Sequence, residues 1–216
     1  MTFTKLPCKA VILDFDGTIA DSFDIFIEAI EAVLKRKQRL TNAEIARLRK
    51  SSIKEIIAKI GIKRWQVPRL VIKGRIEINS RMDRVQAFEG MPEALKALAE
   101  DHVLYIVSTN SEDNILHFLK TYDMLESVSM IYANVGLTSK ARSLKKLLNK
   151  EGLAHEDCLY IGDETRDIEA ARKAGIRCIG VSWGFSNPST LEGCHPDALA
   201  HRPADLVKII GTSNRG

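Results

Sequence analysis

The sequence predicts an α/β protein with a Rossmann-like, three-layer core on a parallel sheet and an inserted helical cap. Short apolar runs alternate with stretches of helical periodicity along most of the 216 residues, which is typical of parallel strands covered by helices on both faces. Residues 21–87 break this rhythm and contain almost no strand-like run. We therefore expect an α/β core domain made of residues 1–20 and 88–216, and a helical cap domain at residues 21–87.

Five apolar runs have the length and continuity of buried strands. They span residues 9–15, 101–109, 127–134, 157–163 and 176–182. Four other segments carry apolar residues at helical spacing: residues 92–100, 112–121, 139–151 and 166–174. Gly175 follows the last of them, where glycine commonly ends a helix. This alternation favours a single parallel sheet.

The insertion carries helix signals of its own. Apolar residues recur at helical spacing in the stretch that begins at Asp24. The sequences TNAE at 41–44 and SIKE at 52–55 are capping boxes, in which a polar residue is followed by Glu three residues later. We expect a long helix over residues 68–84.

The insertion is also basic. Residues 21–87 hold 16 Lys and Arg against 8 Asp and Glu, whereas the rest of the chain holds 16 against 20. This charge could attract an anionic substrate, in which case Arg49, Lys50 and Lys54 are the main candidates because they flank a turn of the cap. It could equally be the solvated face of ordinary helices.

The first predicted strand ends in two acids. Asp14 and Asp16 lie two residues apart, so their side chains start on the same side of the strand. They stand at the carboxyl edge, where open α/β sheets bind ligands. Two carboxylates this close repel each other unless a cation or a shared proton offsets the repulsion. Gly17 then allows a sharp exit from the strand.

Two more acids follow a later strand, Asp163 and Asp167. They could simply be negative charges at a helix N-terminus, where the helix dipole favours them. If the strand ends converge, however, up to four carboxylates gather at one edge. Such a cluster is costly without a hard divalent cation, and an all-oxygen site suits Mg²⁺.

Polar residues that could bind an anion complete the pattern. Ser108, Thr109 and Asn110 follow the second predicted strand, and Lys140 begins the helix after the third. Ser108 and Asn110 could instead cap the next helix, and Lys140 taken alone could be an ordinary surface lysine.

The motifs occur in one order along the chain: DFDGT at 14–18, STN at 108–110, Lys140 and GDETRD at 162–167. In this order they resemble the motifs of the haloacid dehalogenase superfamily, over residues 9–182. A helical cap directly after the first motif resembles the phosphoglycolate-phosphatase-like subgroup. The resemblance implies a Mg²⁺-dependent phosphatase that acts on a small anionic phosphomonoester. Many members have prolines after the lysine, whereas Ala141 and Arg142 follow it here.

The resemblance also implies a role for each acid. Asp14 would be the nucleophile that becomes an aspartyl-phosphate. Asp16 would protonate the leaving alcohol and then activate water. Asp14, the carbonyl of Asp16, Asp163 and, through water, Asp167 would hold Mg²⁺.

The same resemblance makes Ser108, Thr109, Asn110 and Lys140 phosphate-binding residues, with Lys140 bridging the phosphate and the nucleophile. An acid at position 16 favours phosphoryl chemistry, because a dehalogenase expels halide and has no alkoxide to protonate.

Other functions remain open. A phosphotransferase or sugar-phosphate mutase of the same superfamily shares every core motif. A phosphonate hydrolase is a further relative, but it would lack the acid at Asp16. Outside enzymes, the basic insertion could make the chain a polyanion-binding module on an inactive core, whose binding to nucleic acid would fall steeply with salt.

The remaining features concern location and partners. The apolar runs are too short to cross a bilayer, and we see no export signal before the first strand. We therefore expect a cytoplasmic monomer or homodimer that binds a small phosphorylated metabolite and neither membrane nor nucleic acid. Trp183 could shape the entrance to the site or pack in the core. The four cysteines are expected to be buried free thiols: Cys8, Cys158, Cys178 and Cys194.

Overall fold

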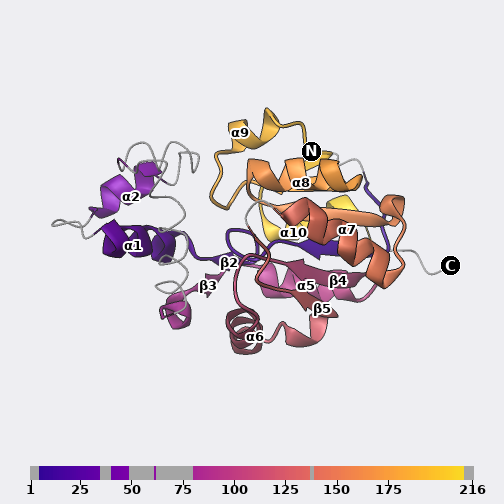
Figure 1. Cartoon of the computed structure of the whole chain (residues 1–216), viewed down its shortest axis with the longest axis horizontal. Helices are drawn as coiled ribbons and strands as arrows, with labels where there is room; N and C mark the ends of the chain where they lie inside the picture. The colour runs from indigo at the N-terminus through magenta and orange to yellow at the C-terminus, as the bar shows by residue number, and fades with distance from the viewer. Residues whose placement is uncertain (1–4, 35–39, 49–60, 62–79, 137–138, 212–216) are drawn as a thin grey trace.

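The computed structural model describes residues 5–34, 40–48, 61, 80–136 and 139–211 (Figure 1). Its main sheet has six parallel strands in the order β5-β4-β1-β6-β7-β8. The strands are β1 Ala10–Leu13, β4 Val103–Val107, β5 Met130–Tyr132, β6 Cys158–Gly162, β7 Arg177–Val181 and β8 Ala198–Ala200. This sheet confirms the predicted α/β, Rossmann-like fold.

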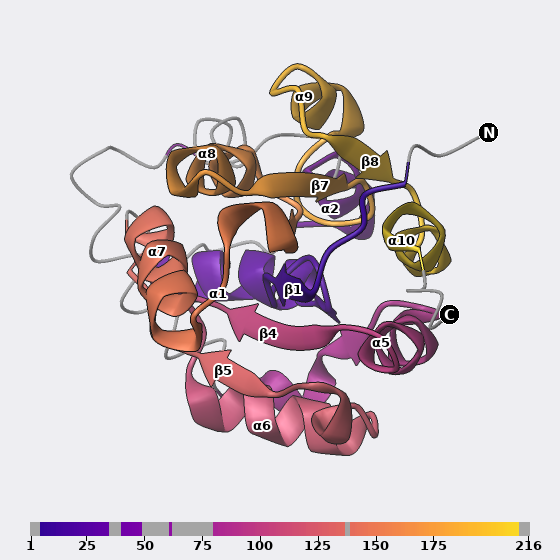
Figure 2. The same cartoon turned by 90° about the vertical axis from the view of Figure 1, so that its right-hand side faces the viewer.

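Two layers of helices cover the sheet (Figure 2). One layer holds α5 Met91–Ala99, α6 Glu112–Thr121 and α10 Pro203–Ile210, and the other holds α7 Lys140–Glu151, α8 Thr165–Ala174 and α9 Pro188–Glu192. Alternate residues of β1 face opposite layers, Val11 and Leu13 the first and Ala10 and Ile12 the second. All four are fully buried, which explains why this strand is apolar at every position.

The strand order brings two distant parts of the chain together. Strand β1 pairs with β4 on one side and with β6 on the other, so that Leu13 is level with both Ile106 and Ile161. Residues that follow these three strands therefore lie at one edge of the sheet. This edge holds the polar motifs found in the sequence.

The C-terminal elements β8, α9 and α10 were not predicted. Strand β8 is only three residues long, too short to produce a recognisable apolar run. Helices α9 and α10 are also short, but each has proline in its first turn, a signal that favours a helix start. The predicted strand at 127–134 is reduced to Met130–Tyr132, and a 3₁₀ turn at Leu125–Ser127 precedes it.

Helices α1 Phe23–Leu34 and α2 Asn42–Leu48 lie to one side of the core (Figure 1). The chain leaves and re-enters the core through two short strands, β2 Ala20–Asp21 and β3 Gln86–Ala87, which pair antiparallel. Among the described residues, these strands place Asp21, Gln86 and Ala87 in strand at the two ends of the segment that was predicted to contain almost none. The pair lies at the boundaries predicted between core and cap, and the division into two domains stays a prediction.

The first predicted capping box is confirmed. The Glu44 carboxylate accepts the Thr41 amide at 2.7 Å and the Thr41 hydroxyl at 2.8 Å, while the Glu44 amide donates to Thr41 Oγ1 at 3.3 Å. The second box lies outside the described residues. Of the helix predicted over 68–84, only residues 80–84 are described, and Met82–Arg84 form a 3₁₀ turn because the chain must become extended at Val85 to enter β3.

No helix among the described residues is both long and apolar enough to cross a membrane. All four cysteines are free thiols, three of them buried and Cys194 partly exposed. Burial raises the pKa of Cys8 to about 12 and that of Cys158 to about 11, so these thiols stay protonated and unreactive.

Candidate active site

Three carboxylates meet at the carboxyl edge of the sheet. Asp14 follows β1, Asp163 follows β6, and Asp167 lies in the first turn of α8. One oxygen of each lies within 4.8 Å of the others, and all three side chains are buried. The structure thus brings together acids that are about 150 positions apart in the sequence.

Lys140 supplies a positive charge inside this cluster. It begins α7, and its Nζ lies 2.6 Å from Asp14 Oδ2 and 2.6 Å from Asp167 Oδ1. Only 4% of its side chain is exposed, so the interpretation as a surface lysine is wrong. Burial of the ammonium opposes its charge, but the carboxylates of Asp14 and Asp167 outweigh this and raise the pKa of Lys140 above its ordinary value.

Asp163 is fixed from two directions. Its Oδ1 accepts the Thr18 hydroxyl at 3.2 Å and its Oδ2 accepts the Phe185 amide at 2.7 Å. Gly17 and Gly184 allow this packing, because a Cβ on either glycine would overlap the Asp163 side chain. Gly17 also has a φ of +78°, which glycine adopts without steric cost.

Asp16 lies outside the three-carboxylate cluster. Its Oδ1 accepts the Ser22 hydroxyl at 2.8 Å, and Asn110 Nδ2 donates to Oδ2 at 3.0 Å and to Oδ1 at 3.3 Å. Burial raises the pKa of Asp16, and the hydrogen bonds from Ser22 and Asn110 oppose that rise. The carboxylate is therefore oriented by two neutral donors rather than by a cation.

The loop after β4 is organised by its own hydrogen bonds. Ser108 is fully buried, and its Oγ accepts the Asn110 amide at 3.0 Å. Asn110 Oδ1 accepts the Ser111 amide and Asn114 Nδ2, both at 2.8 Å. The N-cap of α6 is Ser111, so Ser108 does not cap this helix. Thr109 is partly buried beside them.

Burial makes this cluster hard to ionise. The pKa of Asp14 is raised to about 7, chiefly by burial, with Lys140 lowering it and Asp167 raising it. The pKa of Asp163 is raised well above its ordinary value by burial and by the neighbouring Glu164 and Asp167. A cation placed among the oxygens would relieve this cost.

The residues present fit a hard divalent cation. The donors are carboxylate oxygens only, and they lie within 4.8 Å of one another. Three acids surround a single lysine, so the cluster carries an excess of negative charge when ionised. Such an all-oxygen set suits Mg²⁺.

Several residues of the site were missed from the sequence. Thr18 is the last residue of the first motif, Ser22 lies four residues after it, and Phe185 lies in the loop after β7. Glu164 and Arg166 lie inside the GDETRD motif, between two acids that were predicted to bind Mg²⁺. That position was the signal in the sequence that could have identified them as site residues.

The structure describes Trp183 but not the three basic residues that were proposed to attract the substrate. Arg49, Lys50 and Lys54 lie outside the described residues. Trp183 is partly buried, packs on the main core cluster and against the ring of Phe88, and donates from Nε1 to the Thr18 carbonyl at 3.0 Å. It therefore supports the loop that carries the first motif.

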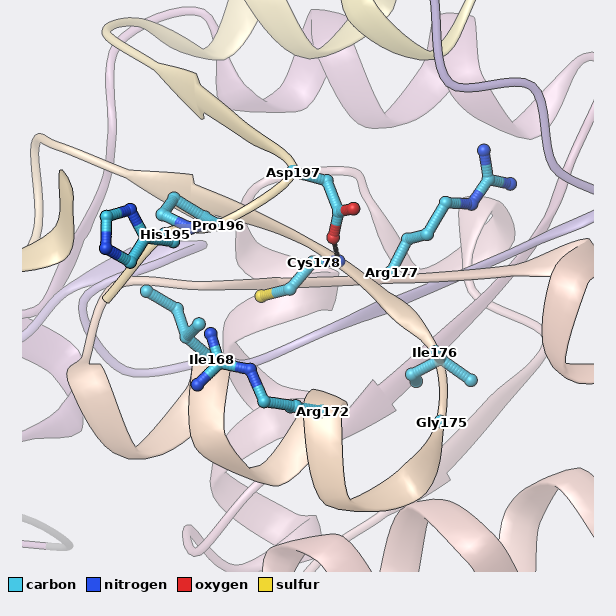
Figure 3. A pocket seen from close by; sticks show the side chains of 9 residues that line it. All are labelled: Ile168, Arg172, Gly175, Ile176, Arg177, Cys178, His195, Pro196 and Asp197. Carbon is cyan, nitrogen blue, oxygen red and sulfur yellow. Dashed lines mark hydrogen bonds between the residues drawn. The ribbon is translucent and has the colours of Figure 1, made fainter. Parts of the chain in front are cut away.

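A separate cavity of about 330 Å³ lies along α8 and β7 (Figure 3). It is lined by Ile168, Arg172, Gly175, Ile176, Arg177, Cys178, His195, Pro196 and Asp197. Two of these groups are already engaged, since Arg172 donates to the Cys194 carbonyl at 2.6 Å and Asp197 accepts the Cys178 amide at 2.8 Å. None of the predicted site residues lines it.

Comparison with known proteins places this arrangement in a family. The family model for haloacid dehalogenase-like hydrolases matches residues 11–181. A phosphoglycolate phosphatase of Synechococcus elongatus is 32% identical over 205 residues, which cover 94% of this chain and 97% of that protein. The pyrophosphatase PpaX of Listeria innocua is 26% identical over 208 residues, which cover 93% and 95%.

Solved structures show the same fold. A haloacid dehalogenase-like hydrolase of Streptococcus pneumoniae superposes with a TM-score of 0.75 at 23% identity, covering 93% of this chain and 97% of that one. This chain therefore belongs to the haloacid dehalogenase-like hydrolases. Within that family it is an enzyme of the phosphatase type.

Proposed function

We propose that the chain is a Mg²⁺-dependent phosphatase that hydrolyses a small anionic phosphomonoester through an aspartyl-phosphate on Asp14. The observation that carries this proposal is the buried contact between Asp14 and Lys140, set within a cluster of three carboxylates. A carboxylate that attacks a phosphate meets charge repulsion, and a lysine beside it offsets part of that repulsion.

In this proposal Asp14 Oδ attacks phosphorus, and the bond from phosphorus to the leaving oxygen breaks. Asp16 gives its proton to that oxygen and later takes one from the water that hydrolyses the aspartyl-phosphate. Ser22 and Asn110 hold the Asp16 carboxylate in place for both transfers. Ser108, Thr109 and Lys140 bind the phosphoryl oxygens.

Asp14, Asp163 and Asp167, with the carbonyl of Asp16, are the residues that would hold Mg²⁺. When bound, the ion supplies positive charge that offsets the charge of the phosphoryl oxygens. The protein's own contribution is to keep these acids convergent and shielded from water.

The relative from Synechococcus elongatus makes phosphoglycolate the first substrate to test. Phosphoglycolate carries a carboxylate as well as a phosphate, so it is a small anionic metabolite. The positive charge of the basic insertion would attract such an anion. The cytoplasm as the site of action and the monomeric or dimeric state stay predictions.

The first test replaces the nucleophile. We expect Asp14→Asn to abolish hydrolysis of p-nitrophenyl phosphate and phosphoglycolate, because an amide cannot form the aspartyl-phosphate. Asp113→Asn changes an exposed acid of α6 and should retain full activity. Circular dichroism would show that both variants fold. Hydrolysis by folded Asp14→Asn at the wild-type rate would refute the nucleophile assignment.

The second test removes the cation. Excess chelator should abolish turnover and added MgCl₂ should restore it, since the cluster needs a cation to be ionised. Full activity in chelator would contradict the metal role. Product analysis in the same assay separates the reactions, because a hydrolase releases inorganic phosphate whereas a mutase returns an isomeric phosphate ester.

A further inference from the structure

Arg166 is a charged residue of the site that the proposed mechanism does not use. It lies in the first turn of α8, between Glu164 and Asp167. One of its terminal nitrogens donates to the buried carboxylate of Glu164. About a third of its side chain, 34%, remains exposed, so the guanidinium extends from the buried cluster to the surface of the core.

One donor of this guanidinium is unsatisfied. Arg166 Nε is buried and has no hydrogen-bond partner within the described part of the chain. Buried N–H groups almost always have a partner, and the guanidinium offers five donors in a fixed plane. An oxygen from a molecule bound beside the guanidinium would satisfy this donor.

Arg166 lies beside the three-carboxylate cluster. It directly precedes Asp167, whose Oδ1 lies 2.6 Å from Lys140 Nζ. The two cations differ in access, however. Lys140 is enclosed and both of its hydrogen bonds go to carboxylates, whereas Arg166 is open to solvent on one side.

We propose that Arg166 is a specificity-determining residue that binds an anionic oxygen of the leaving group, such as the carboxylate of phosphoglycolate or the second phosphate of pyrophosphate. The inference rests on the proposed phosphatase function. Lys140 lies at the nucleophile and serves the transferred phosphoryl group. The leaving group must lie toward solvent, and Arg166, unlike the enclosed Lys140, has part of its side chain open to solvent. A planar guanidinium suits both carboxylate and phosphate.

The experiment compares two kinds of substrate in the holoenzyme with Mg²⁺. Phosphoglycolate and pyrophosphate carry a second anionic group, whereas p-nitrophenyl phosphate carries none. Arg166→Gln should lower kcat/KM for the anionic substrates about 10- to 100-fold, mainly through KM, because it removes a charge-assisted hydrogen bond. The same variant should stay within about threefold of wild type on p-nitrophenyl phosphate. Arg166→Lys should recover part of the loss.

Two controls separate recognition from support of the fold. Arg172→Gln removes a guanidinium from the same helix, one that donates to the Cys194 carbonyl, and should leave both substrate types unaffected. The double variant Glu164→Gln/Arg166→Gln also removes the carboxylate that Arg166 pairs with, and it should remain as poor on phosphoglycolate as the single variant. Recovery in the double variant would show that Arg166 is only a counter-ion and would overturn the proposal.

Other results would also overturn it. Equal losses of kcat/KM on p-nitrophenyl phosphate and phosphoglycolate would show instead that Arg166 binds the transferred phosphoryl group or stabilises the carboxylate cluster. Wild-type preference for p-nitrophenyl phosphate over both anionic substrates would refute the role of Arg166 while leaving the phosphatase intact. Wild-type inactivity on every phosphate ester would refute the proposed function itself.

Discussion

The carboxylate of Asp16 accepts hydrogen bonds from two side chains that come from different parts of the chain. Ser22 directly precedes helix α1, and Asn110 lies after β4. Neither is a cation, so they orient the carboxylate without holding it permanently ionised. This suits a group that must both give and take a proton.

Ser22→Ala removes one of these donors. We expect kcat to fall about threefold to tenfold for substrates with an alcohol leaving group, since one hydrogen bond of about 1 kcal/mol is lost. The loss should be smaller for p-nitrophenyl phosphate, whose leaving group needs less protonation. Steady-state kinetics on both substrates measures the difference.

Ser189→Ala is the matched control, because it removes an exposed serine hydroxyl of α9 that donates to Asn187. It should leave kcat unchanged on both substrates. A Ser22→Ala variant that loses the same factor on both substrates would argue against a role through Asp16.

At the scale of elements, the loop after β7 packs against helix α1. The amide of Phe185 donates to Asp163, while its ring lies 5.4 Å from the ring of Phe23 and 5.5 Å from that of Phe26, measured between centroids. Phe23, Ile27, Leu48 and Phe185 form one small buried cluster. A single residue therefore contacts both a cluster carboxylate and helix α1.

Phe185→Ala keeps the amide and removes the ring. We expect a loss of about 3 kcal/mol in the packing of this cluster, by analogy with other buried aromatic truncations. Amide hydrogen exchange should then speed up in α1 more than in β1. Phe118→Ala, which removes a ring from the main core beside Phe15, should instead affect β1 as well. Unchanged exchange in α1 would show that Phe185 does not stabilise this helix.

At the scale of the whole molecule, the buried acids link stability to pH. The folded pKa values of Asp14 and Asp163 are raised above those of the unfolded chain, which are near 4. A raised carboxyl pKa contributes stability below about pH 4, and that contribution is lost as the pH rises through the folded value, about 7 for Asp14. The metal-free protein is therefore penalised at neutral and alkaline pH.

Mg²⁺ should reverse this penalty, because it binds only the ionised carboxylates. We expect MgCl₂ at about 100 times its Kd to raise Tm by about 5–10 °C at pH 8, and by much less at pH 5. Thermal unfolding with and without MgCl₂ at each pH measures the difference. Asp163→Asn should lose most of the gain at pH 8. An equal gain at pH 5 and pH 8 would contradict this linkage.

The sequence predicted the central architecture because its signals are local. The continuous apolar run of β1 reflects a strand buried on both faces, and Thr41 and Glu44 are close enough in sequence to reveal their capping box. Short elements lack such signals. Strand β8 has three residues, and β2 and β3 have two each, so their pairing partners decide whether they form.

For the site, the sequence by itself determined which acids and which lysine stand at the ends of strands and the starts of helices, because residue type and alternation are properties of neighbouring positions. Only the tertiary structure decided that Lys140 lies between Asp14 and Asp167, that Asn110 and Ser22 hold Asp16, and that Phe185 reaches Asp163. These contacts join segments that are distant in sequence, and they depend on the order of strands in the sheet. No local pattern encodes that order.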